Sequence, residues 1–136
     1  FGSIRQDTGL PVEVTADNLS VDQGDGSAVF TGNVLIGQGE MRLSAARVLV
    51  VYRAEAEGIA RLEATGGVTL VSGKDAAESE RADYDIDTGT IVMSGNVLLT
   101  QGRNALSSDT MSVKLSDGTA QMSGRVKTIL QTGSNN

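Results

Sequence analysis

The sequence has 136 residues and a net charge of −6, long enough for one domain with its own core and too acidic for a nucleic-acid-binding surface. It contains no Cys and no His, which excludes disulfides, thiolate chemistry, His-ligated metals and Ser-His triads. With 17 Gly, one Pro, two Phe, two Tyr and no Trp, it predicts many tight turns, freely pairing strands and an aliphatic core.

The two ends of the chain differ from its middle. Residues 1–10 and 132–136 are polar and aperiodic, so we expect a flexible amino-terminal segment and a flexible tail around a single domain over residues 11–131. The chain begins with Phe1 rather than Met, so we expect that a leader peptide has been removed or that residues 1–3 are a tag remnant. The sequence therefore does not show whether the protein is exported from the cytoplasm.

From residue 12 onward, apolar residues alternate with polar ones, which is the period of β-strands. The apolar run Val48–Tyr52 predicts a strand buried on both faces or covered at one end, and residues 53–57 could form one helical turn. No segment has a sustained helical period, so the chain is predicted to be all-β. Turns containing Gly are predicted at residues 23–26, 38–39, 88–89 and 117–118.

A 13-residue motif occurs twice in the chain. Residues 32–44 and 95–107 are identical at eight positions, and weaker copies surround two further glycines. Repeats of about this length indicate one supersecondary unit used several times. Because Gly inside a strand marks a bend or bulge, we expect a sheet bent at regular places by glycines that contact no ligand. The glycines in question are Gly32, Gly66, Gly95 and Gly124.

The parity of the alternating strands predicts which side chains face the interior. A slip of one residue would invert the set for a whole strand, so errors should fall strand by strand. The predicted inward side chains are Val14, Leu19, Val21, Phe30, Val34, Ile36, Val50, Leu70, Tyr84, Ile86, Met93, Val97, Leu99, Met111, Val113 and Met122.

Two short acidic motifs suggest chemistry, but both have simpler explanations. Residues 7–9 and 87–89 are each Asp-Thr-Gly, the short signature of aspartic proteases, yet this tripeptide is also good turn chemistry and neither copy follows an apolar strand. Residues 83–87 resemble the start of a calcium loop, but Thr88 and Ser94 replace the required Gly and Glu. We therefore predict no catalytic residues, no metal site and no cofactor.

The order of several segments resembles the OstA-like family. The resemblance begins at residues 11–17 and continues through Phe30-Thr31-Gly32-Asn33-Val34 and Gln38-Gly39 to the strand at 48–50. It returns in residues 84–97 and 111–126, so that it covers about residues 11–131. Within the family, the chain is most similar to the periplasmic bridge proteins of lipopolysaccharide transport in Gram-negative bacteria.

This resemblance implies a fold and a function. The fold would be a bent, partly open β-jellyroll, a V-shaped trough built from repeated antiparallel strand units. The inward set above would bind the acyl chains of lipid A, and the protein would carry lipopolysaccharide toward the outer membrane without catalysing a reaction. Its partners would be LptC-like and LptD-like proteins of the same fold, together with further copies of itself joined head to tail.

A bent sheet that does not close leaves unpaired strands at its two ends, and such edges pair with other chains. By chain order, the first strand covers about residues 12–17 and the last about 126–130. Arg125 and Lys127 flank one edge, while Glu13 and Asp17 flank the other, so opposite charges could help set the polarity of docking. The predicted assembly residues are Val12, Glu13, Val14, Thr15, Ala16, Val126, Lys127, Thr128, Ile129 and Leu130.

Two other hypotheses remain beside the bridge protein. The chain could be the periplasmic domain of a same-fold partner, LptC-like or LptD-like. It could also be a structural β-solenoid module whose core is filled by its own side chains. A carrier and a filled module differ in whether the interior can open to a lipid.

Overall fold

The computed structural model describes residues 10–22, 24, 26–53 and 58–131. These residues form ten strands of one antiparallel sheet and contain no helix, hence none that could span a membrane. The strands are β1 (Glu13–Thr15), β2 (Asn18–Asp22), β3 (Ser27–Gln38), β4 (Met41–Tyr52), β5 (Ile59–Ser72), β6 (Asp75–Asp85), β7 (Thr90–Gln101), β8 (Asn104–Lys114), β9 (Thr119–Ser123) and β10 (Lys127–Ile129).

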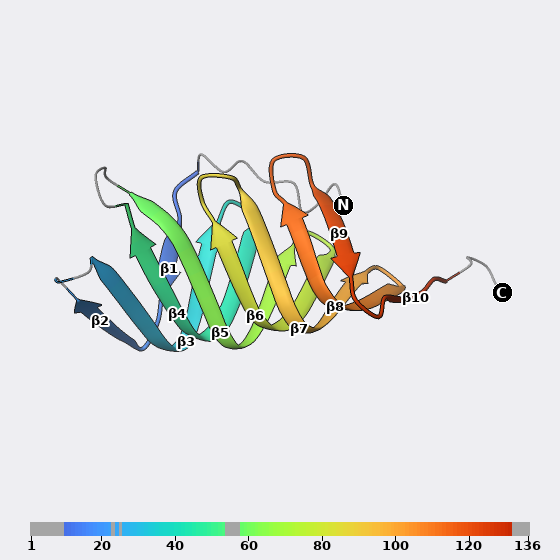
Figure 1. Ribbon diagram of the computed structural model, residues 1–136, viewed down its shortest axis with the longest axis horizontal. Coiled ribbons are helices and arrows are strands. Elements are labelled where there is room, and N and C mark those ends of the chain that lie inside the picture. Colours follow the sequence, from blue (N-terminus) through green and yellow to red (C-terminus); the bar gives the residue numbers. More distant parts are fainter. Residues whose placement is uncertain (1–9, 23, 25, 54–57, 132–136) are drawn as a thin grey trace.

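From β3 to β8, each long strand pairs with the next one in the chain (Figure 1). At one edge β1 and β2 pair with the two halves of β3, and at the other β10 and β9 pair with the two halves of β8. The sequence predicts one strand at each edge, over residues 12–17 and 126–130. Both predicted strands are at the edges, as the shorter β1 and β10, and each edge also has a second short strand, β2 or β9, on the other side of the bend.

The sheet bends near the middle of its long strands, where the pairing register shifts. The bends line up as a crease, and the two halves of the sheet form two walls that meet along it (Figure 1). The first wall contains β2, β9 and residues 27–31, 47–52, 59–65, 81–85, 90–94 and 110–114. The second wall contains β1, β10 and residues 34–38, 41–44, 68–72, 75–78, 97–101 and 104–108. We call the edge of the walls farthest from the crease the open margin.

The repeated glycines lie on the crease, as the sequence predicts, and Gly95 shows why. Its φ is +85°, and a Cβ atom there would lie 2.8 Å from the Cβ of Glu80 on the neighbouring strand. The next residue, Asn96, also has a positive φ, and its Nδ2 donates a hydrogen bond to Glu80 at 2.6 Å. The bend thus needs a residue without a side chain, followed by one that holds the acid alongside.

The same arrangement occurs at both ends of the crease. Asn33 donates to Asp17 at 3.0 Å, and the Arg125 guanidinium donates to Asp109 at 2.7 Å. This hydrogen bond lowers the pKa of the Asp109 carboxyl below its usual value. Asp17 and Arg125 are two of the charges predicted to set docking polarity. Both have these contacts within the chain but remain exposed, so their part in docking polarity stays a prediction.

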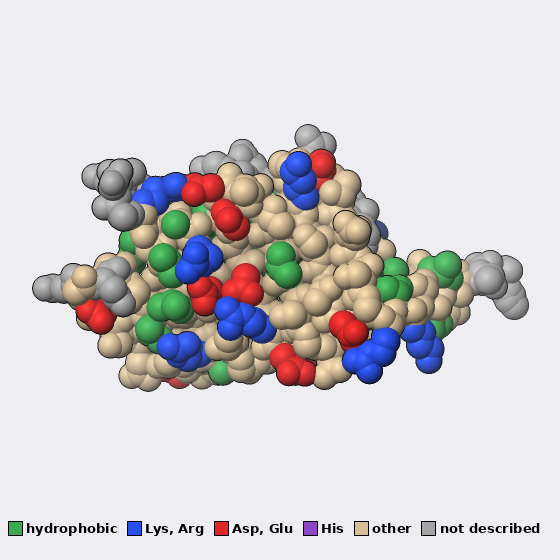
Figure 2. Space-filling view, in the orientation of Figure 1, with side chains coloured by type: hydrophobic (Ala, Val, Ile, Leu, Met, Phe, Trp, Pro, Cys, Tyr) green, Lys and Arg blue, Asp and Glu red, His purple; other side chains and the backbone are tan. Residues whose placement is uncertain are grey.

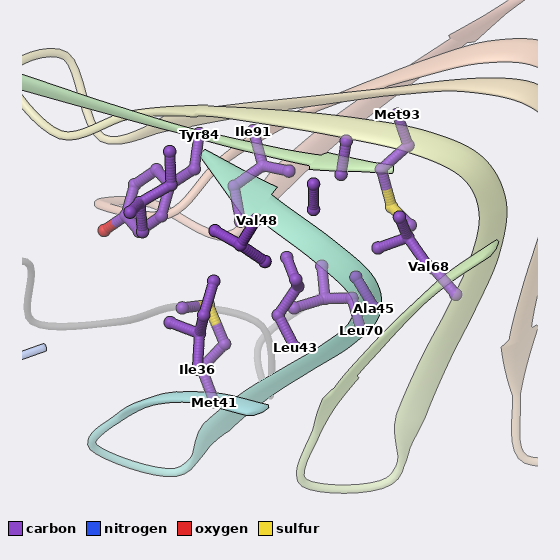
Figure 3. Close-up of a cluster of buried hydrophobic side chains, with 14 of the residues drawn as sticks. Ile36, Met41, Leu43, Ala45, Val48, Val68, Leu70, Tyr84, Ile91 and Met93 are labelled. Carbon is purple, nitrogen blue, oxygen red and sulfur yellow. The ribbon is translucent and has the colours of Figure 1, made fainter. Parts of the chain in front are cut away.

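Inward side chains of both walls form one continuous, mainly aliphatic core (Figure 3). Val48, Tyr84 and Ile91 of the first wall face Ile36 and Met41 of the second. Each of these five side chains is at most 1% exposed. The two walls are therefore in contact with each other between the crease and the open margin.

The remaining local predictions have mixed outcomes. The apolar run Val48–Tyr52 lies in β4, but burial on both faces is wrong, because Val48 and Val50 are in the core while the outward Leu49 and Val51 are only half-buried and lie outside it. Most of the possible helical turn at residues 53–57 and most of the two predicted flexible ends lie outside the described residues. The predicted turns are present, with positive φ at Gly26, Gly39, Gly89 and Gly118.

Candidate functional site

The space between the two walls is the candidate site, because it gathers most of the predicted inward side chains. Ten of the 16 are buried, four are half-buried against the core, and two are exposed. The buried ones are Val34, Ile36, Val50, Leu70, Tyr84, Met93, Val97, Leu99, Met111 and Val113. The half-buried ones are Val14, Phe30, Ile86 and Met122. The structure places these residues on one face of the sheet; their contact with lipid stays a prediction.

Leu19 and Val21 of β2 are 56% and 60% exposed, although their parity is inward. Leu19 is paired with Phe30, and Phe30 with the buried Val48. Leu19 therefore belongs to a row of inward side chains that begins in the core at Val48 and runs across β3 to the edge of the sheet. Leu19 and Val21 are exposed because β2 is the last strand on the first wall and no further strand of the described chain lies beside it.

The opposite edge of the sheet, at β9 and β10, also carries exposed apolar side chains. Met122 of β9 pairs with the buried Met111, and beyond it Val126 and Leu130 are 51% and 62% exposed. Figure 2 shows hydrophobic side chains on the surface around β10. The apolar core between the walls thus continues to solvent-exposed apolar side chains at both ends of the sheet.

Several lining residues are absent from the predicted set. Leu62, Val68 and Ile91 are at most 2% exposed, and the alternating parity of their strands was sufficient to identify them. Gln38 is different: it is 1% exposed but polar, and the sequence assigns it to a turn. Its spacing of two residues from the inward Ile36 was the available signal.

Gln38 and Tyr84 form a buried polar contact at the open margin. The Tyr84 hydroxyl donates to Oε1 of Gln38 at 2.7 Å, and Nε2 of Gln38 donates to the carbonyl of Leu10 at 2.9 Å. Figure 3 shows Tyr84 at the end of the core cluster farthest from Ala45 and Val68 near the bend. Burial raises the pKa of Tyr84 to about 12, while the hydrogen bond with Gln38 partly offsets this rise.

The outer face of the first wall carries exposed charged side chains, with hydrophobic ones such as the 40% exposed Val92 between them. Arg81 contacts both Glu63, at 3.1 Å, and Asp83, at 2.8 Å, and Arg61 contacts Glu63 at 2.8 Å. Figure 2 shows these charge types interspersed over the wall. Exposed ion pairs of this kind contribute little to stability. This face therefore differs from the inward face mainly in being hydrated.

The acidic motifs occupy turns and outer faces. Asp87-Thr88-Gly89 forms the turn between β6 and β7, where the Gly89 amide donates to the Asp85 carbonyl at 2.9 Å and Asp87 pairs with Arg53. Asp83 is held by Arg81 on the outer face. Among the described residues, no group of three or more acidic side chains is placed to hold a metal ion. The first Asp-Thr-Gly copy, at residues 7–9, lies outside the described residues.

The predicted assembly residues lie at opposite edges of the sheet. β1 and β10 are the end strands of the order β1-β3-β4-β5-β6-β7-β8-β10. Glu13 and Lys127 are exposed at these edges and carry opposite charges. The alternating pattern predicts strands at the positions of β2 and β9, but the sequence did not identify them as the first-wall edges. Pairing with another chain at any of these strands stays a prediction.

Comparisons with known proteins agree with this architecture. Residues 13–126 match the family described as LptA/(LptD N-terminal domain) LPS transport protein. A solved structure, that of LptH, the LptA homologous periplasmic component of the lipopolysaccharide transport device of Pseudomonas aeruginosa, superposes with a TM-score of 0.82. The alignment covers 93% of this chain and 99% of LptH at 16% identity, which shows a shared fold. The prediction of a bent, OstA-like β-jellyroll is thereby confirmed.

A curated relative is also similar in sequence. An uncharacterized protein of Rhizobium meliloti (strain 1021) is 30% identical over 90 residues, which are 61% of this chain. The matched region is 48% of that relative, so the chain spans about half the length of the curated relative it matches.

Proposed function

The chain belongs to the family of LptA and the LptD N-terminal domain, which are lipopolysaccharide transport proteins, and from this membership we propose that it is a non-catalytic lipopolysaccharide carrier of the periplasm. Its groove binds lipid A acyl chains, and it works as one unit of a bridge to the outer membrane. The observation that carries this proposal is the apolar core between the walls, which continues from Leu19 and Val21 at one end of the sheet to Met122 at the other.

The lining suits acyl chains because it is mainly aliphatic, and hydrophobic contacts do not depend on direction. Each methylene group moved from water into such a groove contributes about 0.8 kcal/mol, so affinity needs no charged contact within it. The paired charged groups Arg61, Glu63, Arg81 and Asp83 lie on the outer face of the first wall instead, and among the described residues only Asp75, 6% exposed, is a buried acid.

Acyl chains must displace contacts between the walls. Ile36 and Tyr84, on opposite walls, are each 1% exposed, so a lipid between them requires the walls to separate. The crease is the fixed side of this movement, because the long strands run through it from one wall to the other. The open margin is the side that widens, because within the described residues no β-ladder joins the walls there.

Transport through the groove also requires units to join. β1 and β10 are edge strands with different sequences, so pairing of one with the other is heterologous and extends as a filament. The same edges would dock LptC-like and LptD-like proteins of this fold. Glu13 on β1 and Lys127 on β10 are the opposite charges available to orient that docking.

Two specific observations favour alternatives. The family description includes the LptD N-terminal domain, so the chain could be the corresponding domain of an LptD-like or LptC-like partner. The contact between the walls favours a structural module with a filled core. Both the bridge and a partner domain bind lipid, whereas a filled module does not.

Site-specific photo-crosslinking to lipopolysaccharide tests the proposal. A photoreactive amino acid replaces Phe30, whose side chain faces the groove near its exposed end. The control replaces Val92, which is 40% exposed on the outer face of the same wall. We expect a lipopolysaccharide adduct from position 30 and none from position 92. Equal labelling at the two positions, or no labelling at position 30 in a folded protein, would contradict lipid binding in the groove.

A further inference from the structure

We propose that Gln38 and Tyr84 form a latch across the open margin, which holds the two walls together and must open before acyl chains enter. The entry of acyl chains rests on the proposed function; the latch itself does not. Gln38 is the last residue of β3 on the second wall, and Tyr84 is the next-to-last residue of β6 on the first. Each lies at the end of its wall segment that is farthest from the crease.

The hydrogen bond between them crosses the groove and is not part of the sheet ladder. β3 and β6 are separated in the sheet by β4 and β5, so their residues cannot be ladder partners. Gln38 pairs with Met41 in the sheet, and Tyr84 pairs with Leu62 and Ile91. The two side chains meet only because the crease folds one wall over the other.

The chemistry of this contact differs from that of its surroundings. Contacts such as those of Ile36, Met41 and Ile91 are apolar, and acyl chains can replace them with contacts of the same kind. An acyl chain offers no donor for the Gln38 amide oxygen and no acceptor for the Tyr84 hydroxyl. Because both groups are 1% exposed, a lipid that separates them breaks the hydrogen bond between them before water can replace it.

Gln38 also links the latch to an edge of the sheet. Its Nε2 donates to the carbonyl of Leu10, a few residues before β1. A chain that docks on β1 and shifts this segment would move a direct hydrogen-bond partner of the latch. Docking at that edge and opening of the margin are therefore coupled through one amide group.

Distances between spin labels across the margin test the latch without any lipid. The chain has no Cys, so Lys74→Cys and Thr88→Cys place labels only in the β5–β6 turn of the second wall and the β6–β7 turn of the first. In this background Tyr84→Phe should raise the population of long distances about fivefold, the effect of one buried hydrogen bond. Tyr52→Phe, the same change at a side chain 46% exposed, should leave the distances unchanged.

A second variant separates loss of the latch from general loosening. Gln38→Leu combined with Tyr84→Phe replaces both polar partners by apolar groups, which can pack without an unsatisfied oxygen. The distances should then return toward those of the parent protein. The latch is refuted if Tyr84→Phe, shown to be folded by circular dichroism, has the parent's distances, or if the double variant is as open as the single one.

The lipid measurement then adds the functional part. Lipopolysaccharide crosslinking at position 30 should proceed about fivefold faster in the Tyr84→Phe protein, because the separated form is more populated. Altered distances with an unchanged crosslinking rate would overturn the role of the latch in lipid entry. A parent protein that never crosslinks would refute the proposed function, while the label distances would still decide whether the latch exists.

Discussion

Gly95→Ala should destabilise the fold at the crease more than its backbone geometry alone explains. The residue has a φ of +85°, which an L-residue with a side chain adopts only with strain. Its added methyl group would also meet the side chain of Glu80, at 2.8 Å from Cβ and 2.9 Å from Cδ. Glu80 would have to move, and its 2.6 Å hydrogen bond with Asn96 would break.

These two effects set the expected loss. The strained backbone costs about 1–2 kcal/mol. Loss of the hydrogen bond to a charged acceptor costs about 1 kcal/mol at this exposed position. We therefore expect the free energy of unfolding to fall by about 2–3 kcal/mol in total.

A matched variant isolates the steric part. Gly102 also has a positive φ, +58°, but an added Cβ there would meet nothing within 4 Å. Gly102→Ala should therefore lose only the backbone contribution, about 1 kcal/mol. Urea unfolding followed by circular dichroism measures both variants. If Gly95→Ala and Gly102→Ala lose the same free energy, contact with Glu80 does not explain why Gly is needed at the bend.

Three further predictions concern the groove and the edges. Burial raises the pKa of Tyr84 to about 12 in the folded protein. As the pH rises, the Tyr84 hydroxyl therefore loses its proton in the unfolded chain before it does so in the folded one. The free energy of unfolding should thus fall by up to about 2–3 kcal/mol between about pH 10 and 12. In Tyr84→Phe that fall should be absent, and identical pH profiles would contradict the assignment. Phe30→Asp or Ile36→Asp should abolish lipopolysaccharide crosslinking at an unchanged groove position, since an unpaired carboxylate among acyl chains costs several kcal/mol; a variant folded by circular dichroism that crosslinks normally would refute the lipid path. Truncation after Gly124 removes β10 and should leave monomers in light scattering at concentrations where the full chain associates, whereas equal association would exclude the terminal-strand mechanism.

The bends were predictable because their cause is local. A residue whose added Cβ would overlap the adjacent strand has to be Gly, so the bend at Gly32 leaves the same mark in the sequence as the bend at Gly95. Alternating parity is local as well, which is why residues such as Met93 and Val113 were placed correctly on the inward face. Both signals depend only on neighbouring residues.

The contacts between the walls were not predictable in this way. Gln38 and Tyr84 are 46 residues apart and meet only after two walls fold together, so neither position has a local signal for the other. The ion pair of Arg125 with Asp109 likewise has no local signal, because it depends on the bend at Gly124. The exposure of Leu19 and Val21 depends on where the sheet ends, which parity does not determine.

The most direct test of the central claim is native mass spectrometry of the protein purified from lipopolysaccharide-producing bacteria. If the apolar interior is a lipid groove, the intact protein should carry an adduct with the mass of lipopolysaccharide or lipid A, and a folded Phe30→Asp variant should carry much less of it. A native protein that is free of lipid after gentle extraction, or a variant that retains the full adduct, would contradict the account and favour a structural module with a filled core.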